Sequence, residues 1–352
     1  MLASIGCPIE MGVNISDIVP YDEIGLGDLE GRTVAIDAYN AIYQFLSVIR
    51  QPDGTPLKDL KGRVTSQLSG LLYRNINLIQ TGILPAYVFD GVPSRLKSDT
   101  ISERGERRAK AEMEWKEAKD RGDMETAFTK ATQSSRITNE IVKSSRILLT
   151  YLGIPVIQAP SEGEAQAAFM ASRGDVWAAS SQDFDSLLFG APRLVRNLTL
   201  TGRRKLPGSR RYRTVNLEQI ELQRTLEHLE ITREQLVGLC ILMGTDFNPG
   251  IKGIGPKKGL ALIKKHGDLE SVLEARGDEI EDHDTIRRIF LDYEGKEDYD
   301  LSWKEPDRER VIEFMVEEHD FSMDRVNSAL DKLESKREEE TARASQSSLD
   351  MF

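Results

Sequence analysis

Cysteine is scarce in this sequence, and long apolar runs are absent. The 352 residues include two cysteines and four histidines, too few for a disulfide framework or a zinc cluster. No apolar run approaches the ~20 residues that a transmembrane helix needs. The acidic residues Glu10 and Asp17 make the N-terminus a poor secretory signal. These absences predict a soluble protein of a reducing, intracellular compartment, with no membrane partner.

The chain also lacks an excess of basic residues, because its formal net charge is −11. Taken alone, this charge argues weakly against a nucleic-acid partner. Net charge says little when acidic and basic residues are segregated, so their placement matters more than their sum. Charged residues make up 30% and hydrophobic residues 39% of the chain, which is typical of a globular protein with a highly charged surface.

Short apolar runs alternate with longer segments of helical periodicity. The runs with strand character are Thr33–Ile36, Ala86–Phe89, Pro155–Ile157 and Val176–Ala179. The helical segments include Ile42–Arg50, Gln67–Gln80 and Ile137–Leu152. This alternation predicts an α/β fold with a mostly parallel sheet flanked by helices. Helices are expected again from Gly255 to about Lys336, and the polar tail after Lys336 is expected to be disordered.

Two charged stretches can be explained as solvated structure without a functional role. Arg95–Arg146 is dense in charge of both signs and has few aliphatic residues before Ile137, so composition favours a solvated helical insertion. A basic cluster later in the chain could follow a duplex backbone, but a solvated β-hairpin explains it equally well. The cluster consists of Arg203, Arg204, Lys205, Arg210, Arg211 and Arg213.

Seven acidic residues follow predicted strands or other apolar runs. They are Asp37, Asp90, Glu162, Glu164, Asp183, Asp185 and Asp246. Ligands of open α/β sheets bind at the carboxyl ends of the strands, so these side chains are expected to converge. Converging carboxylates repel one another unless cations lie between them. Oxygen ligands suit hard ions such as Mg²⁺ or Mn²⁺ rather than zinc, and two ions ~3.5–4 Å apart can drive phosphodiester cleavage.

Each acid also has an ordinary structural explanation. Glu164 follows Ser161 at the spacing of a capping box, and Glu162 would favour a helix N-terminus. The two glutamates do not share a helix face, so both bind metal only if the first helical turn points at the ions. A single Asp after a strand is more often a turn residue. The repeated placement at strand ends nevertheless favours a metal site.

A glycine-rich segment after the last of these acids predicts an anion-binding helix entry. Gly253 and Gly255 permit a tight turn whose amides face an anion, and Pro256 suits the first helical turn. Lys257 and Lys258 add positive charge beside the helix N-terminus. The pattern matches a helix-hairpin-helix that binds the DNA backbone. The alternative is a plain glycine-rich helix entry, and P-loop spacing is absent.

In this order, these motifs resemble the flap endonuclease family of XPG-like 5′ nucleases, most of all its archaeal members. The similarity extends from about Met11 to the C-terminus. It is carried by VAIDAYNAIYQFL (34–46), AYVFDGVPSRLKS (86–98), APSEGEAQAA (159–168), SSQDFDSLLFG (180–190), LCILMGTDFNPGIKGIGPKK (239–258) and the terminal QSSLDMF.

The resemblance implies a PIN-like 5′ nuclease fold with a helical arch. It also implies a Mg²⁺-dependent endonuclease with 5′–3′ exonuclease activity that cuts at the base of 5′ flaps. Such an enzyme would serve Okazaki fragment processing and repair in an archaeal cytoplasm or nucleoid. Two alternatives are a mainly exonucleolytic or bubble-cutting relative, and a DNA-binding scaffold with a dead site. Compact length and a clamp-binding motif disfavour the first, and the presence of all seven acids disfavours the second.

The resemblance also assigns roles to individual residues. The first of two Mg²⁺ ions would take Asp37, Asp90, Glu162 and Glu164, and the second would take Asp183, Asp185 and Asp246. The expected DNA contacts are Arg50, Gly253, Gly255, Lys257 and Lys258. Lys97 and Arg104 match a basic pair that steadies the scissile phosphate, and Tyr43 matches an aromatic residue that stacks on the base beside the cut. A K⁺ ion is expected near Ile251 and Ile254.

Finally, the resemblance divides the chain. The expected parts are a nuclease region 1–108, an arch 109–136 that the 5′ flap threads, a nuclease region 137–268 with the helix-hairpin-helix, a helical region 269–336, and a disordered tail 337–352. Residues 1–10 are expected to be a non-native extension, because Met11-Gly12-Val13 matches the family's start, which lies near the active site. In the tail, Gln346, Leu349 and Phe352 resemble the motif that docks on the sliding clamp (PCNA), without its usual second aromatic. A monomer is expected.

Overall fold

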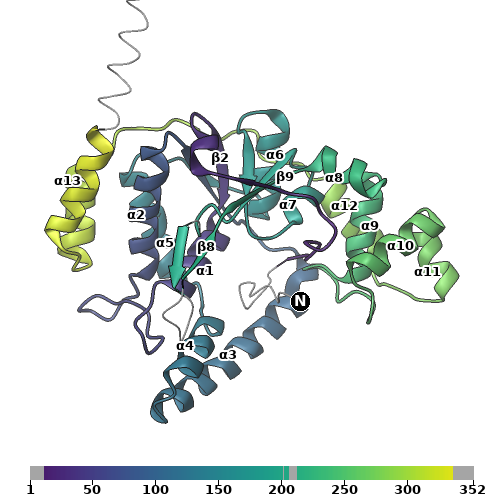
Figure 1. Cartoon of the computed structure of the whole chain (residues 1–352), viewed down its shortest axis with the longest axis horizontal. Helices are drawn as coiled ribbons and strands as arrows, with labels where there is room; N and C mark the ends of the chain where they lie inside the picture. The colour runs from purple at the N-terminus through teal and green to yellow at the C-terminus, as the bar shows by residue number, and fades with distance from the viewer. Residues whose placement is uncertain (1–11, 201, 206–211, 336–352) are drawn as a thin grey trace, which may run out of the picture.

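The computed structural model describes residues 12–200, 202–205 and 212–335 (Figure 1). The strands are β1 Asp22–Ile24, β2 Thr33–Asp37, β3 Leu84–Phe89, β4 Val156–Gln158, β5 Ala178–Ser180, β6 Arg193–Arg196, β7 Gly202–Lys205, β8 Tyr212–Val215 and β9 Leu217–Glu221. The helices are α1 Ala38–Val48, α2 Ser66–Gln80, α3 Ser98–Asp120, α4 Met124–Gln133, α5 Asn139–Tyr151, α6 Gly163–Arg173, α7 Asp185–Leu188, α8 Leu222–Leu229, α9 Arg233–Met243, α10 Pro256–His266, α11 Leu269–Arg276, α12 His283–Leu291 and α13 Arg308–Ile312. A further helix spans residues 323–335. No helix within these described ranges is both long and apolar enough to cross a membrane.

Seven strands form one sheet in the order β1-β9-β6-β5-β2-β3-β4. Neighbouring strands run parallel from β6 to β4, whereas β9 and β1 complete the other edge in antiparallel pairing. Helices cover both faces of this sheet (Figure 1). The structure therefore confirms the predicted α/β class with a mostly parallel sheet.

Strand β2 shows why the strands appear in the sequence as continuous apolar runs. Its residues Val34 and Ile36 belong to the core on one face of the sheet, and Ala35 belongs to the core on the other. Successive side chains of a strand point to opposite faces, so a strand covered on both faces is apolar at every position. One core packs against α1, α2 and α5, and the other packs against α6, α7 and α9. Polar side chains can therefore gather only at the ends of the strands.

Helices α3 and α4 form a hairpin, here called the arch, that projects away from the sheet (Figure 1). The apolar side chains that they bury are small: Ala111, Ala118, Ala127 and Ala131. This agrees with the helical insertion of little apolar surface that composition predicts. Helix α3 continues unbroken from residue 98 to residue 120. The expected division between residues 108 and 109 therefore lies inside a helix, and the helical hairpin starts at Ser98 instead.

The described part of the basic cluster lies on two paired strands. Strands β7 and β8 pair antiparallel, with Arg203 opposite Thr214 and Arg204 opposite Arg213. Arg210 and Arg211 lie outside the described residues. The four described basic residues therefore lie on a β-hairpin, and this pairing is compatible with both interpretations.

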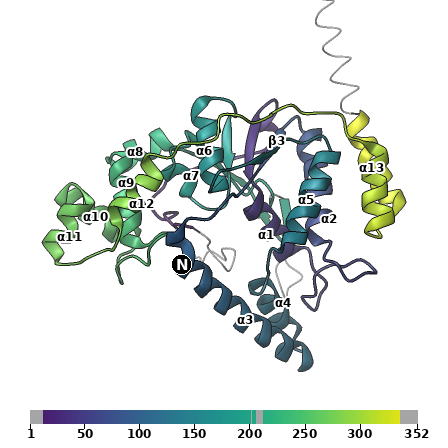
Figure 2. The same ribbon diagram turned by 180° about the vertical axis from the view of Figure 1, so that it is seen from behind.

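The segment 292–307 is extended, so the expectation of helices throughout the C-terminal region is wrong here. Figure 2 shows this segment crossing the molecule between α12 and α13. The amide of Gln166 pairs with the backbone of Lys296 in both directions, each bond 2.8 Å long. The indole N–H of Trp303 donates to the carbonyl of Pro85 at 2.8 Å. Such distant partners have no local sequence signature, and they satisfy backbone groups that a helix would satisfy internally.

A close contact between α1 and α2 depends on Gly70. A Cβ at this position would lie 2.2 Å from Cγ of Phe45. Gly70→Ala should therefore lower the free energy of unfolding by about 1–3 kcal/mol through overpacking. Gly105 in α3 has no heavy atom within 4 Å of a built Cβ, so Gly105→Ala should be neutral or stabilise by about 0.5–1 kcal/mol. Chemical denaturation of both variants checks this, and equal stabilities would contradict it.

Candidate active site

The carboxyl ends of three neighbouring parallel strands each carry a predicted acid. Asp37 ends β2, Asp90 follows β3, and Asp183 comes shortly after β5. The other four acids come from helix ends: two from the start of α6, one from the start of α7 and one from the loop after α9. Mutual repulsion between these groups links all seven. The structure thus brings together the whole predicted set, here called the carboxylate cluster.

Backbone amides orient three of these carboxylates. Asp37 caps α1, where Oδ1 accepts from the N–H groups of Tyr39 at 2.9 Å and Asn40 at 3.1 Å. Oδ1 of Asp90 accepts from the N–H of Gly163 at 2.6 Å. A Cβ on Gly163 would lie 2.8 Å from that same oxygen, so only glycine allows so close an approach. Asp37 is therefore a capping residue and a member of the cluster at once.

The third amide comes from the beginning of the described chain. Oδ1 of Asp185 accepts from the N–H of Val13 at 2.9 Å. A Cβ on Gly12 would lie 2.8 Å from Cβ of Asp183. The N-terminal segment therefore lies against the cluster, as the resemblance implied. The specific bond to Asp185 was not predicted, because an amide donor has no side-chain signature.

The two glutamates of α6 both reach the cluster. Glu162 is the N-cap of α6 and makes no side-chain cap bond, so the capping box expected from Ser161 is not formed. Glu164 is partly buried and is repelled by Asp185, Asp183 and Asp37. Its buried Oε1 has no hydrogen-bond partner. The first turn of α6 therefore points at the other acids, which was the condition for both glutamates to be ligands.

Burial and mutual repulsion raise the pKa values of four of these acids. Burial, followed by repulsion from neighbouring carboxylates, raises the pKa of Asp37 and of Glu164 well above the usual range. The same causes raise the pKa of Asp90 to about 6 and that of Asp185 to about 8. Buried carboxylates of raised pKa, together with an unpartnered buried oxygen, fit hard cations, because an ion among them would remove the repulsion.

Two cationic side chains from the base of the arch enter the cluster. Lys97 pairs with Glu162, and its Nζ lies 3.3 Å from Oδ2 of Asp246. Nη2 of Arg104 lies 2.5 Å from Oδ1 of Asp246. Burial alone would lower the pKa of Lys97, but attraction to Glu162 and Asp246 outweighs it and raises the pKa. The predicted basic pair is therefore in place, bound to carboxylates.

The structure supports Tyr43 and Arg50 less well as DNA contacts. Tyr43 is buried, and the guanidinium of Arg108 lies 5.9 Å from its ring centroid. Arg50 donates to the carbonyl oxygens of Leu46 and Gly54, each at 2.6 Å, and to Oγ of Ser135 at 2.7 Å. Burial lowers the pKa of Arg50 to about 10. Its guanidinium is thus engaged in joining α1 to the base of the arch rather than directed at a phosphate.

The glycine-rich loop adopts the predicted helix entry. Gly253 has a φ of 81°, a left-handed conformation that glycine adopts readily. Gly255 caps α10, and Pro256 occupies its first turn. Lys257 and Lys258 are exposed, and Nζ of Lys258 donates to the carbonyl of Gly253 at 3.3 Å. The local geometry of an anion-binding helix N-terminus is therefore present.

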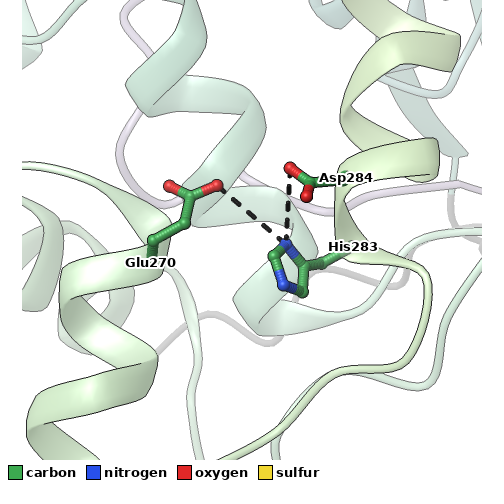
Figure 3. Close-up of side chains that lie close together, drawn as sticks. All are labelled: Glu270, His283 and Asp284. Carbon is green, nitrogen blue, oxygen red and sulfur yellow. Dashed lines mark ion pairs between the residues drawn. The ribbon is translucent and has the colours of Figure 1, made fainter.

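A separate group of potential metal ligands lies between α11 and α12 (Figure 3). Nδ1 of His283 is 4.0 Å from Oε1 of Glu270 and 3.9 Å from Oδ1 of Asp284. Arg287 binds the same two carboxylates at 2.7 and 2.8 Å. This guanidinium already binds one oxygen of each carboxylate and offsets one of the two negative charges, so we assign no metal to the group.

Comparison with known proteins supports a common origin. Family models match residues 15–111 as an XPG N-terminal domain and residues 153–246 as an XPG I-region. A protein named Flap endonuclease 1 from Pyrococcus abyssi is 52% identical over 92% of this chain and 94% of its own length. A protein of the same name from Ignicoccus hospitalis is also 52% identical, over 97% of this chain and 99% of its own length. The structure of flap endonuclease-1 from Methanococcus jannaschii is 44% identical, with a TM-score of 0.74, and covers 92% of this chain and 98% of that one. The catalytic core of Rad2 in complex with a DNA substrate shares the fold, with a TM-score of 0.66, 23% identity and coverage of 91% and 97%.

The raised pKa of Asp185 predicts how stability depends on pH without metal. The folded protein holds this proton more tightly than the unfolded chain, so stability should fall as pH rises from about 4 towards 8. Asp185→Asn cannot ionise. In EDTA it should exceed the wild type in unfolding free energy at pH 8 by at least about 1 kcal/mol, and by less at pH 5.

Denaturant titrations at both pH values measure this difference. Asp120→Asn, at an exposed position on α3, is the control and should show no pH-dependent gain. A constant difference between Asp185→Asn and the wild type from pH 5 to 8 would contradict the explanation.

Proposed function

This chain belongs to the flap endonuclease family, and we propose that its carboxylate cluster binds two Mg²⁺ ions and cuts DNA at the base of 5′ flaps. Members of the family are metal-dependent nucleases that hydrolyse DNA phosphodiesters, and this chain is one of them. The observation that carries the two-ion proposal is the convergence of seven acids whose mutual repulsion bound cations would relieve.

The cluster divides into two sets of proposed ligands. The first comprises Asp37, Asp90, Glu162 and Glu164, and the second comprises Asp183, Asp185 and Asp246. Glu164 is repelled by members of both sets, so cations held by either set would relieve this repulsion. When bound, the ions supply an activated water and stabilise the charge of the leaving oxygen. Mn²⁺ has the same preference for oxygen ligands and is expected to substitute for Mg²⁺.

The basic pair is proposed to bind the scissile phosphate. Lys97 and Arg104 are largely but not fully buried, with 14% and 19% of their side chains exposed. They come from the base of the arch, whereas the acids come from the sheet and from α6, α7 and α9. A phosphate arriving between them can accept hydrogen bonds now made to Glu162 and Asp246. Donors held in place before the reaction stabilise the developing charge at little reorganisation cost.

Further DNA contacts are proposed away from the cluster. The N-terminus of α10, with Lys257 and Lys258 exposed beside it, suits a duplex phosphate. A K⁺ ion near Ile251 and Ile254 would join this loop to the backbone of the duplex. The arch is proposed as the passage for the single-stranded flap, and Tyr43 as a stacking residue that would have to become exposed. The enzyme is expected to act as a monomer at the chromosome, in the cytoplasm or nucleoid.

The proposal is tested by cleavage of an end-labelled duplex with a 5′ flap and a one-nucleotide 3′ overlap. Mg²⁺ should support incision near the flap junction, and EDTA, blunt duplex and single strands should give little cutting. Asp183→Ala should lower the rate by at least about 100-fold, because a proposed metal ligand is lost, while DNA affinity is retained. Retained turnover in Asp183→Ala would contradict the metal assignment. No cleavage by a chain beginning at Met11 would favour a DNA-binding scaffold.

The sliding clamp is a proposed partner. Gln346, Leu349 and Phe352 lie outside the described residues, so this proposal depends on the sequence motif alone. A fluorescently labelled tail peptide should bind the clamp in an anisotropy titration, and a peptide with Leu349→Ala and Phe352→Ala should bind more weakly because its apolar anchors are missing. No binding at high micromolar clamp would contradict the proposal.

A further inference from the structure

Asn40 lies between two acids of the carboxylate cluster. Its backbone N–H donates to Oδ1 of Asp37 at 3.1 Å, and its Nδ2 donates to Oδ2 of Asp183 at 3.1 Å. One residue in the first turn of α1 thus binds the carboxylate at the end of β2 and the carboxylate beyond β5. Asn40 itself is 6% exposed, whereas its partner Asp183 is partly exposed.

Two more buried side chains extend this contact. Gln44 lies one helical turn further along α1, on the same face as Asn40, and its Nε2 donates to Oδ1 of Asn40 at 2.6 Å. The hydroxyl of Thr199 donates to Oε1 of Gln44. Gln44 and Thr199 are 3% and 8% exposed. The loop that carries Thr199 is anchored in turn, because Nε of Arg74 donates to the carbonyl of Leu198 at 2.9 Å.

The chain of bonds can run in only one direction. A carboxylate that binds a metal is ionised and only accepts hydrogen bonds, so in that state Asn40 must present its NH₂ group to Asp183. Its carbonyl oxygen then faces Gln44, which must donate. The remaining oxygen of Gln44 accepts from Thr199, whose hydroxyl can rotate to donate. Turning either amide over would place two acceptors in contact inside the protein, so each link fixes the next.

We propose that Asn40, oriented by Gln44 and Thr199, is a positioning residue that holds Asp183 ready to bind metal. The inference rests on the two-ion function proposed above. Asp183 carries charge of the same sign as Asp37, Glu164 and Asp185, which repels it from the cluster. A neutral amide opposes that repulsion without adding a positive charge that would compete with a cation. Outer groups of this kind typically contribute about 10- to 100-fold to metal affinity or activity.

The test measures metal binding and activity separately. The full-length chain without DNA is titrated with Mn²⁺ in a calorimeter, and the Mg²⁺ concentration for half-maximal flap cleavage is then determined. Asn40→Leu, of nearly equal shape, should weaken Mn²⁺ binding and raise the Mg²⁺ midpoint by about 10- to 100-fold. Affinity for flap DNA in EDTA should not change, because that binding needs no ion in the cluster.

Thr199, at the far end of this chain of hydrogen bonds, gives a second test with a smaller expected loss of Mn²⁺ affinity. Thr199→Val keeps the shape but removes the hydroxyl, and should weaken Mn²⁺ binding by roughly 2- to 10-fold, the range of one neutral hydrogen bond. Thr199→Ser keeps the hydroxyl and should restore wild-type affinity. Gln67→Leu is the matched control. Gln67 is also a buried amide, bonded to Ser144 between α2 and α5, and its loss should lower stability without changing Mn²⁺ affinity.

The outcomes distinguish this inference from the function beneath it. Wild-type Mn²⁺ affinity in Asn40→Leu would overturn the positioning role, as would losses in Asn40→Leu no larger than those in Gln67→Leu. Equal Mn²⁺ affinities in Thr199→Ser and Thr199→Val would show that the hydroxyl does not orient Gln44. That result would overturn the proposed chain of hydrogen bonds. A wild-type protein that binds no Mn²⁺ would overturn the two-ion function itself, and this inference with it.

Discussion

Repulsion among buried carboxylates is the constraint on which the rest of this structure depends. Seven acids meet at one edge of the sheet, where burial and like charge raise the pKa of Asp185 to about 8. The protein counters this in several ways. Backbone amides bind Asp37, Asp90 and Asp185, and Asn40 binds Asp183. Lys97 and Arg104 supply part of the missing positive charge. The negative charge that these groups leave uncompensated is the physical reason for metal dependence.

The fold makes this concentration of charge possible. The parallel strands β2, β3 and β5 end side by side, and helices cover both faces of the sheet, so the acids that follow these strands lie close together. Helices α1 and α6 then begin beside the acids, and N–H groups of their first turns donate to Asp37 and Asp90. Burying the carboxylates costs free energy, and the two extensive apolar cores on the two faces of the sheet offset this cost. A ligand-binding site and a stable scaffold are thus products of one arrangement.

The arch brings the site its positive charge from outside the sheet. Lys97 and Arg104 lie where α3 leaves the body of the protein, so moving the arch would change the charge of the cluster. Arg50 and Lys119 anchor the arch to the loop after α1, through Gly54, Ser135 and Asp53. The geometry of the basic pair is therefore coupled to contacts well away from the chemistry. This coupling links the arch to the pair of residues that we propose to bind the scissile phosphate.

Local patterns were enough to identify the fold class, the seven acids and the helix entry at Gly255, whereas the basic pair came only from the family resemblance. Apolar periodicity marks where strands end, and the residues just beyond those ends become neighbours in a parallel sheet. The same patterns could not reveal that segment 292–307 is extended, that Arg50 is a structural anchor, or that Asn40 binds an acid. Asn40 meets Asp183 across 143 positions of sequence, and Arg50 meets Ser135 across 85. Periodicity records which residues are buried, but only the packed chain decides which distant group lies opposite each one.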